Sequence, residues 1–154
     1  MTKDAPTFAV MNPLEEHIGY HLRRASALTM AMLSQRLAEV ELTIAEASVL
    51  VLIDSNKGLT QSEVGRLLGI KRANMAPLTA AIEGRGLVRR QTIVGRSIAL
   101  ATTLHGRAIA RRAKTIMLMN DAAVFASLDE EAKRQLREIL LPVWSGEPSP
   151  HAED

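Results

Sequence analysis

The topology of this chain is set by residues 59–102, LTQSEVGRLLGIKRANMAPLTAAIEGRGLVRRQTIVGRSIALAT. Thr60 and Glu63 have the spacing of a capping box, so a short helix is expected to begin there and to end at Gly69. A second helix is expected over 71–84, after a turn of only two residues. Two short helices joined by such a turn form a helix-turn-helix.

The end of this stretch changes from a helical to a strand pattern. Residues 87–93 and 98–102 are expected to form two strands joined by the turn Val94-Gly95-Arg96-Ser97. Another capping box, Thr43-Ile44-Ala45-Glu46, begins an earlier helix. Residues 43–103 are therefore predicted to be a winged helix-turn-helix DNA-binding domain, which presents its second helix to a major groove about 12 Å wide. The alternative is an αα-corner with a structural role only.

The charge is distributed unevenly along the chain. Between Lys57 and Lys114 there are twelve Lys and Arg residues and only two Glu, a net charge of +10, whereas the rest of the chain carries −8. A basic centre between acidic ends is typical of a module that binds phosphates. The alternative is a basic, solvated surface without a partner.

Apolar residues recur at helical spacing on both sides of the winged domain. A long amphipathic helix is expected from Asn12-Pro13 to about Ala38, and 127–130 predicts the start of a last helix. These apolar stripes are too extensive for a small winged helix to cover, so 12–40 and 104–145 are predicted to form a helical dimerisation region. The interface candidates are Leu14, Ile18, Leu136, Leu140 and Trp144.

The composition excludes several other classes of protein. The chain has no cysteine, which excludes disulfides, thiolate metal sites and cysteine nucleophiles. No apolar run approaches the roughly 18 residues of a membrane span and no signal pattern is present, so a cytoplasmic protein without membrane contact is expected. No carboxylate pair, nucleophile triad or phosphate-binding glycine loop stands out, so no catalytic residue, cofactor or metal is predicted. Residues 1–11 and 146–154 are expected to be flexible tails, and the fold class is mainly α with a small β-wing.

Three stretches resemble the multiple-antibiotic-resistance-regulator (MarR) family of winged-helix transcriptional regulators. They are LTQSEVGRLLGI at 59–70, IEGRGLV at 82–88, and SLDEE at 127–131 leading into LREIL at 136–140. The resemblance covers roughly residues 14–144. It implies a homodimer with intertwined first and last helices, a palindromic DNA operator, and release by a small, often aromatic or anionic, effector. The alternative is a winged helix that binds nucleic acid nonspecifically, or an acidic protein partner, without effector control.

The predicted DNA contacts lie at the helix N-termini and on the wing. Helix N-termini attract phosphate, and cationic and amide side chains suit phosphates and base edges. For Thr60 the alternative is a helix cap without a DNA contact. Arg89 and Arg90 are adjacent in a strand and point to opposite faces, so only one of them can face the DNA. The candidates are Thr60, Gln61, Lys71, Arg72, Asn74, Met75, Arg89, Arg96 and Ser97.

Two positions depart from the family pattern. The family's wing usually reads Asp-x-Arg, whereas this chain has Val94-Gly95-Arg96, which keeps the minor-groove cation and lacks the bracing carboxylate. Pro77 falls inside the second helix of the motif, where it removes a backbone N–H. Either the helix is kinked there, or the turn before Pro77 is not regular helix.

A small group of polar residues near the start of the first helix is the candidate effector site. His17 and His21 have the four-residue spacing of half a metal site, but no partner pair stands out elsewhere, so no metal is predicted. His21 and Arg24 border the apolar stripe, where an arginine can hold an effector carboxylate.

Overall fold

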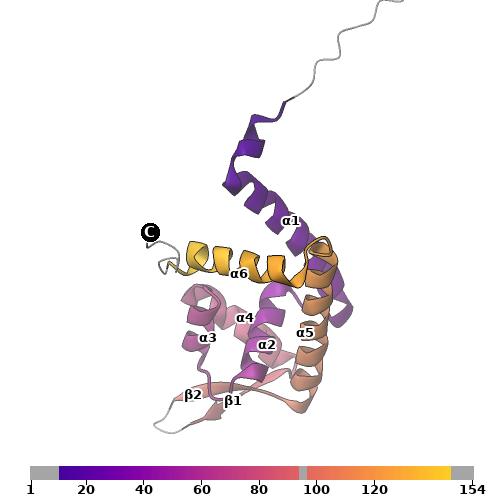
Figure 1. Ribbon diagram of the computed structural model, residues 1–154. Coiled ribbons are helices and arrows are strands. Elements are labelled where there is room, and N and C mark those ends of the chain that lie inside the picture. The colour runs from indigo at the N-terminus through magenta and orange to yellow at the C-terminus, as the bar shows by residue number, and fades with distance from the viewer. Residues whose placement is uncertain (1–10, 94–96, 147–154) are drawn as a thin grey trace, which may run out of the picture.

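The computed structural model describes residues 11–93 and 97–146, and Figure 1 shows their arrangement. Two 3₁₀ turns, η1 (Pro13–Glu16) and η2 (Ala38–Val40), flank the first helix. A two-stranded antiparallel sheet follows the fourth helix and precedes the fifth. The helices and strands are α1 (Ile18–Leu37), α2 (Ile44–Ser55), α3 (Gln61–Leu67), α4 (Arg72–Gly84), β1 (Val88–Thr92), β2 (Ile98–Thr102), α5 (Leu104–Val124) and α6 (Glu130–Ser145).

A compact lobe forms around α2, which packs against α4, α5 and β2. Its core contains aliphatic side chains from every one of these elements, among them Leu50, Ile82 and Leu100. The sheet pairs Val88 with Thr102 and Thr92 with Ile98, so the two strands form a regular hairpin. The predicted winged helix-turn-helix is confirmed, with the order helix, helix, turn, helix, hairpin.

The helices begin at capping hydrogen bonds that the sequence predicts. Both predicted capping boxes are present: Thr43 and Glu46 begin α2, and Thr60 and Glu63 begin α3. The Asp129 carboxylate accepts a hydrogen bond from the Ala132 N–H at the start of α6, which confirms the predicted last helix.

The first helix differs from its prediction. Asn12 does cap a turn that begins with Pro13, but this turn is the short 3₁₀ helix η1 and ends after Glu16. His17 has an extended backbone (φ −100°, ψ 119°), and α1 begins only at Ile18. The apolar periodicity could not reveal the break, because it runs through both segments with the same spacing.

Pro77 does not interrupt α4, which runs without a break from Arg72 to Gly84. The missing N–H of Pro77 would have bonded the carbonyl of Ala73. Ala73 is exposed, so water can satisfy this carbonyl. The possibility that the turn before Pro77 is not regular helix is therefore wrong.

A close contact ties the start of α5 to the base of the hairpin. The hydroxyl of Thr103 donates to the carbonyl of Gly86 (2.6 Å), and the Thr103 N–H donates to the carbonyl of Leu87 (3.0 Å). A Cβ atom on Gly106 would lie 1.7 Å from the same Leu87 oxygen. Only glycine therefore permits this approach of helix and strand.

Two faces of the chain have no cover within the described residues. The turn η1 and the N-terminal half of α1 project away from the lobe (Figure 1), where Leu14 of η1 is 50% exposed and Ile18 of α1 is 78% exposed. No residue of α6 is buried, and Trp144 near its end is 71% exposed, while Leu136 and Leu140 are half-buried. An apolar surface of this extent calls for a partner.

Candidate nucleic-acid interface

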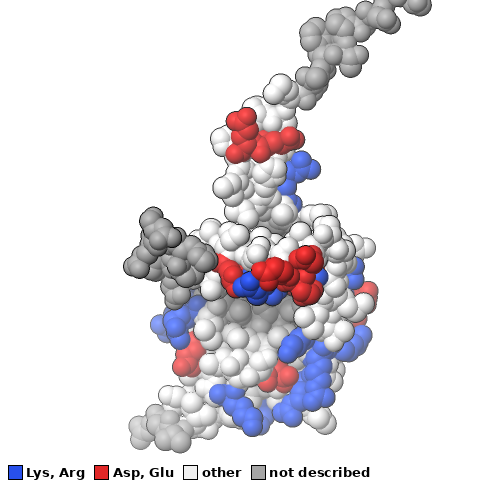
Figure 2. Space-filling view, viewed as in Figure 1, with Lys and Arg blue, Asp and Glu red and all other residues white. Residues whose placement is uncertain are grey.

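Basic side chains gather on the part of the lobe that carries the sheet and the nearby end of α5 (Figure 2). Acidic side chains lie mainly on α6 and on the turn η1 that precedes α1 in this view. The uneven charge distribution along the sequence therefore becomes a division between two regions of the surface. The basic region includes the elements of the winged helix-turn-helix.

The helix-turn-helix is held by a close contact between α3 and α4. A Cβ atom on Gly65 would lie 2.9 Å from the Cγ of Met75 and 3.1 Å from the carbonyl oxygen of Ile70. The Ile70 N–H donates to the Gly65 carbonyl (2.8 Å), which closes the turn between the helices. The angle between α3 and α4 thus depends on a glycine at position 65.

The N-terminus of α4 presents three polar side chains to solvent. Lys71, Arg72 and Asn74 are all exposed, and none of them has a side-chain hydrogen bond or ion pair within the described residues. The carbonyl of Lys71 accepts hydrogen bonds from the N–H groups of Asn74 and Met75, so this first turn is regular. Donors at a helix N-terminus are suited to bind phosphates and acceptor edges of bases.

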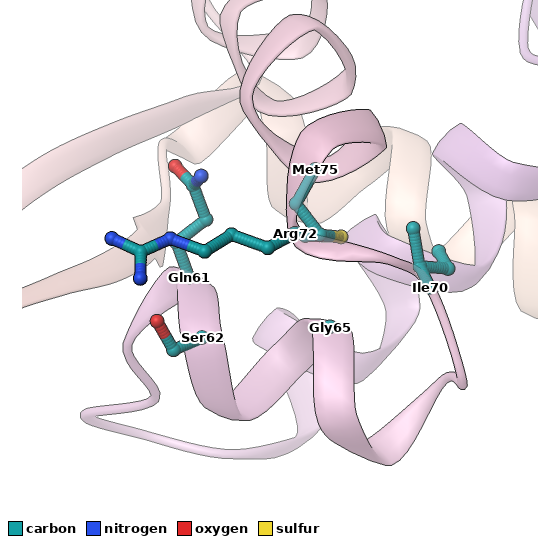
Figure 3. A pocket seen from close by; sticks show the side chains of 6 residues that line it. All are labelled: Gln61, Ser62, Gly65, Ile70, Arg72 and Met75. Atoms are coloured by element: carbon teal, nitrogen blue, oxygen red, sulfur yellow. The ribbon is translucent and has the colours of Figure 1, made fainter.

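A hollow of ≈ 390 Å³ lies between the N-terminal turns of α3 and α4. Figure 3 shows the Arg72 side chain extending over this hollow toward Gln61 and Ser62. Ser62 is exposed on the first turn of α3 and was not among the predicted contacts. Its position directly after the capping threonine and Gln61 was the signal that could have identified it.

Thr60 acts as the cap of α3. Its N–H donates to the Glu63 carboxylate (2.7 Å), and its hydroxyl accepts from the Glu63 N–H (3.3 Å). The hydroxyl also donates to the same carboxylate (2.8 Å). These bonds from the Thr60 backbone and hydroxyl lower the pKa of Glu63. Thr60 thus has the capping role that the sequence analysis gave as the alternative to a phosphate contact.

Met75 lies in the core, contrary to its prediction as a DNA contact. Its side chain is 1% exposed and packs against Gly65 of α3. The sequence placed it one turn from Lys71 and Arg72, and therefore near their side of the helix. Its side chain instead fills the space against α3 that the missing side chain of Gly65 leaves open. Asn74 is the neighbour that remains exposed.

The wing strand β1 separates its two arginines onto opposite faces. Arg90 donates to the Glu83 carboxylate of α4 (Nε to Oε2, 3.0 Å) and contacts the Gln61 amide oxygen of α3 (3.4 Å), so it lies on the helix-turn-helix side. Arg89 is exposed on the other face. Ser97 is exposed, and its carbonyl accepts from the Ile93 N–H (2.9 Å) at the end of the hairpin. Arg96 lies outside the described residues.

The candidate effector residues lie at the exposed N-terminal end of α1. His17 is the N-cap residue of α1 and has no side-chain capping bond, so the expectation that it lies within the first helix is wrong. The His21 Nε2 lies 2.7 Å from the Glu15 carbonyl oxygen, and Arg24 donates to the Tyr20 hydroxyl (3.2 Å). The hydrogen bonds from Asn12 and from Arg24 lower the pKa of Tyr20.

Over residues 11–93 and 97–146, no three His, Asp or Glu side chains come together as a metal site. In the same part of the chain, no helix has the length and apolarity needed to cross a bilayer.

The fold and the basic surface define the class of protein: a winged helix-turn-helix that binds DNA. Residues 42–95 match the model of the MarR family. The HTH-type transcriptional repressor Rv2887 of Mycobacterium tuberculosis is 30% identical over 125 residues, which cover 80% of this chain and 90% of the relative. The chain belongs to the MarR family and is a homodimeric, DNA-binding transcriptional regulator.

Solved structures show the same fold. The transcriptional repressor CouR bound to a 23-mer DNA duplex is 34% identical, with a TM-score of 0.79, and the match covers 88% of this chain and 97% of that one. CouR from Rhodococcus jostii RHA1 bound to p-coumaroyl-CoA is 25% identical, with a TM-score of 0.80 and coverages of 86% and 95%. Rv2887 of Mycobacterium tuberculosis in complex with salicylic acid is 30% identical, with a TM-score of 0.65 and coverages of 82% and 95%.

Proposed function

We propose that this regulator is a repressor that binds a two-fold symmetric operator and is released by an aromatic carboxylate or its coenzyme A thioester. The observation that carries the DNA-binding part is the exposed group of Lys71, Arg72 and Asn74 at the start of α4, whose side chains have no partner in the described part of the chain. The group lies on the helix that a helix-turn-helix presents to the major groove. No catalytic step belongs to this proposal, and we place its action in the cytoplasm.

Each exposed residue has a distinct role in the proposed complex. Arg72 and Asn74 reach base edges, because guanidinium and amide groups read guanine and adenine in the major groove. Lys71 and the N-terminus of α3 at Gln61 bind phosphates, which fix the register. The wing, through Arg96 and Ser97, contacts the minor groove.

The dimer is proposed to form through the uncovered faces of α1 and α6. Residues 12–40 and 104–145 would make the dimerisation region, and residues 43–103 the DNA-binding domain. The exposed Ile18 and Trp144 and the half-buried Leu136 support this arrangement, because a monomer would leave them in contact with water. Leu14 and Leu140 complete the proposed interface.

The effector class rests on the relatives. CouR has been solved with p-coumaroyl-CoA, and Rv2887 with salicylic acid and with p-aminosalicylic acid. Each of these ligands contains an aromatic ring and an acid or acid-derived group. In this chain Arg24 and His21 offer a cation and a ring nitrogen at the uncovered end of α1, and His17 directly precedes this helix.

The test is a binding assay with DNA from upstream of the regulator's own gene. Wild-type protein is expected to protect one symmetric site, and aromatic acids or their coenzyme A thioesters are expected to release it. Arg72→Ala should weaken this binding, whereas Arg112→Ala removes an exposed charge of α5 and serves as the control. Uniform coating of all DNA would support the alternative of nonspecific binding and would contradict the operator.

The effector site is tested separately. Arg24→Ala should raise the effector concentration needed for release while leaving operator affinity in its absence unchanged. Release at the wild-type concentration would remove Arg24 from the site.

A further inference from the structure

A second basic surface lies outside the helix-turn-helix. A groove of ≈ 460 Å³ runs between the C-terminal end of α2, the sheet and the first turns of α5. We call it the flank groove. Four cations and one carboxylate line it, namely Lys57, Arg89, Arg107, Arg111 and Asp54.

Contacts of Asp54 hold part of the flank groove in place. The Asp54 carboxylate accepts a hydrogen bond from the Thr102 hydroxyl (3.0 Å) and lies 3.7 Å from the Nε of Arg107. Arg107 also follows Gly106, whose contact with Leu87 ties α5 to the hairpin. Arg107 is therefore held in place at the sheet and still has a 54% exposed side chain.

The other three cations are exposed and available. The side chains of Lys57, Arg89 and Arg111 form no hydrogen bond or ion pair within residues 11–93 and 97–146. Arg111 follows Arg107 by four residues, so both lie on one face of α5. The single carboxylate is already engaged by Arg107 and Thr102, which leaves the groove with an excess of positive charge.

The groove is continuous with the wing. Arg89 and Gln91 share one face of β1, and both line the groove, whereas Arg90 on the other face contacts the helix-turn-helix. From Arg89 to the strand end at Thr92 is about 10 Å at about 3.3 Å per residue. The four residues from Arg107 to Arg111 extend about 6 Å along α5, which runs across the strands and not along them (Figure 1). At about 3.4 Å per base pair, the strand length alone spans roughly three base pairs.

We propose that the flank groove binds the phosphate backbone of DNA that flanks the operator, up to roughly three base pairs beyond the wing contact. The inference rests on the proposed operator binding and extends it. Its cations come from three different elements and stay exposed, which suits a row of phosphates better than one enclosed anion. Because these contacts reach only phosphates, they add affinity without sequence preference.

The experiment uses two duplexes built on the operator once footprinting has located it. The core duplex ends at the outermost base pair that the wing protects, and the extended duplex adds six base pairs of arbitrary sequence at each end. A duplex of the extended length with a scrambled operator corrects for nonspecific binding. The proteins are full-length wild type, Arg111→Ala, and the control Arg112→Ala, which lies next to it on α5 and outside the groove.

Arg111→Ala is expected to lose affinity for the extended duplex only. The dimer loses two phosphate contacts, each about 5-fold at 0.15 M salt, so the expected loss is about 30-fold. The slope of log K against log salt should become shallower by about 1.8 for the same reason. Hydroxyl-radical protection should shorten at both ends of the site. Arg112→Ala should match the wild type on both duplexes.

Three results would overturn the flank contact. The first is wild-type affinity of Arg111→Ala for the extended duplex, and the second is an equal loss on both duplexes. The third is an unchanged footprint with an altered response to the effector, which would make the groove a small-anion site. Failure of the wild type to select the operator over the scrambled duplex is a different outcome and would refute the proposed function itself.

Discussion

Replacing Gly106 with alanine tests how firmly the first turn of α5 is tied to the wing. The added Cβ would lie 1.7 Å from the Leu87 carbonyl oxygen, roughly half of an ordinary contact distance. Leu87 is buried in the core and Thr103 bonds the same backbone, so neither side can move freely. Overpacking costs about 1–3 kcal/mol, a lost Thr103 hydrogen bond about 1 kcal/mol, and alanine's better helix propensity returns up to about 1 kcal/mol. The expected net loss is about 1–4 kcal/mol.

The measurement is urea unfolding at one fixed protein concentration, because the stability of a dimer depends on concentration. Gly84→Ala is the matched control: Gly84 is also helical, and a Cβ there meets no atom within 4 Å. We expect the control to be neutral or slightly more stable. A Gly106→Ala protein within 0.5 kcal/mol of the wild type would refute the close-contact argument.

Four further outcomes follow from the site and the assembly. Arg72→Ala should cost about 1–3 kcal/mol on the operator and relax the preference at one position of each half-site, and competition against operator variants would measure both. Arg96→Ala should weaken binding mainly where the flanking minor groove is narrow and A·T-rich, and an equal loss on G·C-rich flanks would contradict this. Deleting residues 128–154 should give an aggregating or monomeric protein without operator affinity, and a well-behaved monomer with normal binding would refute the dimer. The folded-state pKa of Glu63 is lowered, so its capping bonds contribute stability above its ordinary value of 4.5 that is lost as pH falls through the folded pKa. Glu63→Gln should therefore flatten the acid side of the stability profile.

Local signals in the sequence predicted most of the fold correctly. The capping boxes at Thr43 and Thr60 work through residues three positions apart, so they survive in any tertiary context. The change from helical to alternating pattern identified the hairpin, and 98–102 forms the second strand. Such features need no knowledge of what packs against them.

The errors arose where packing or backbone geometry determines the outcome. Met75 is a plausible DNA contact by position, but the missing side chain at Gly65 opens a space that Met75 fills. His17 lies in the apolar pattern of a helix, yet the short turn capped by Asn12 ends before it. Apolar periodicity alone predicts neither how closely two helices pack nor how long a capped turn is.

Arg89 and Arg90 show where sequence and structure complement each other. The sequence established that two adjacent strand residues cannot face the same surface, and it favoured Arg89 as the DNA contact. In the structure Arg90 lies on the helix-turn-helix side, where the Glu83 carboxylate 3.0 Å from its Nε reduces the charge it can offer to a phosphate. Arg89 lies on the opposite face, in the flank groove, without such a partner in the described part of the chain. The arginine that keeps its charge available is thus directed away from the recognition helix, and if it binds DNA, it must do so beside the operator core.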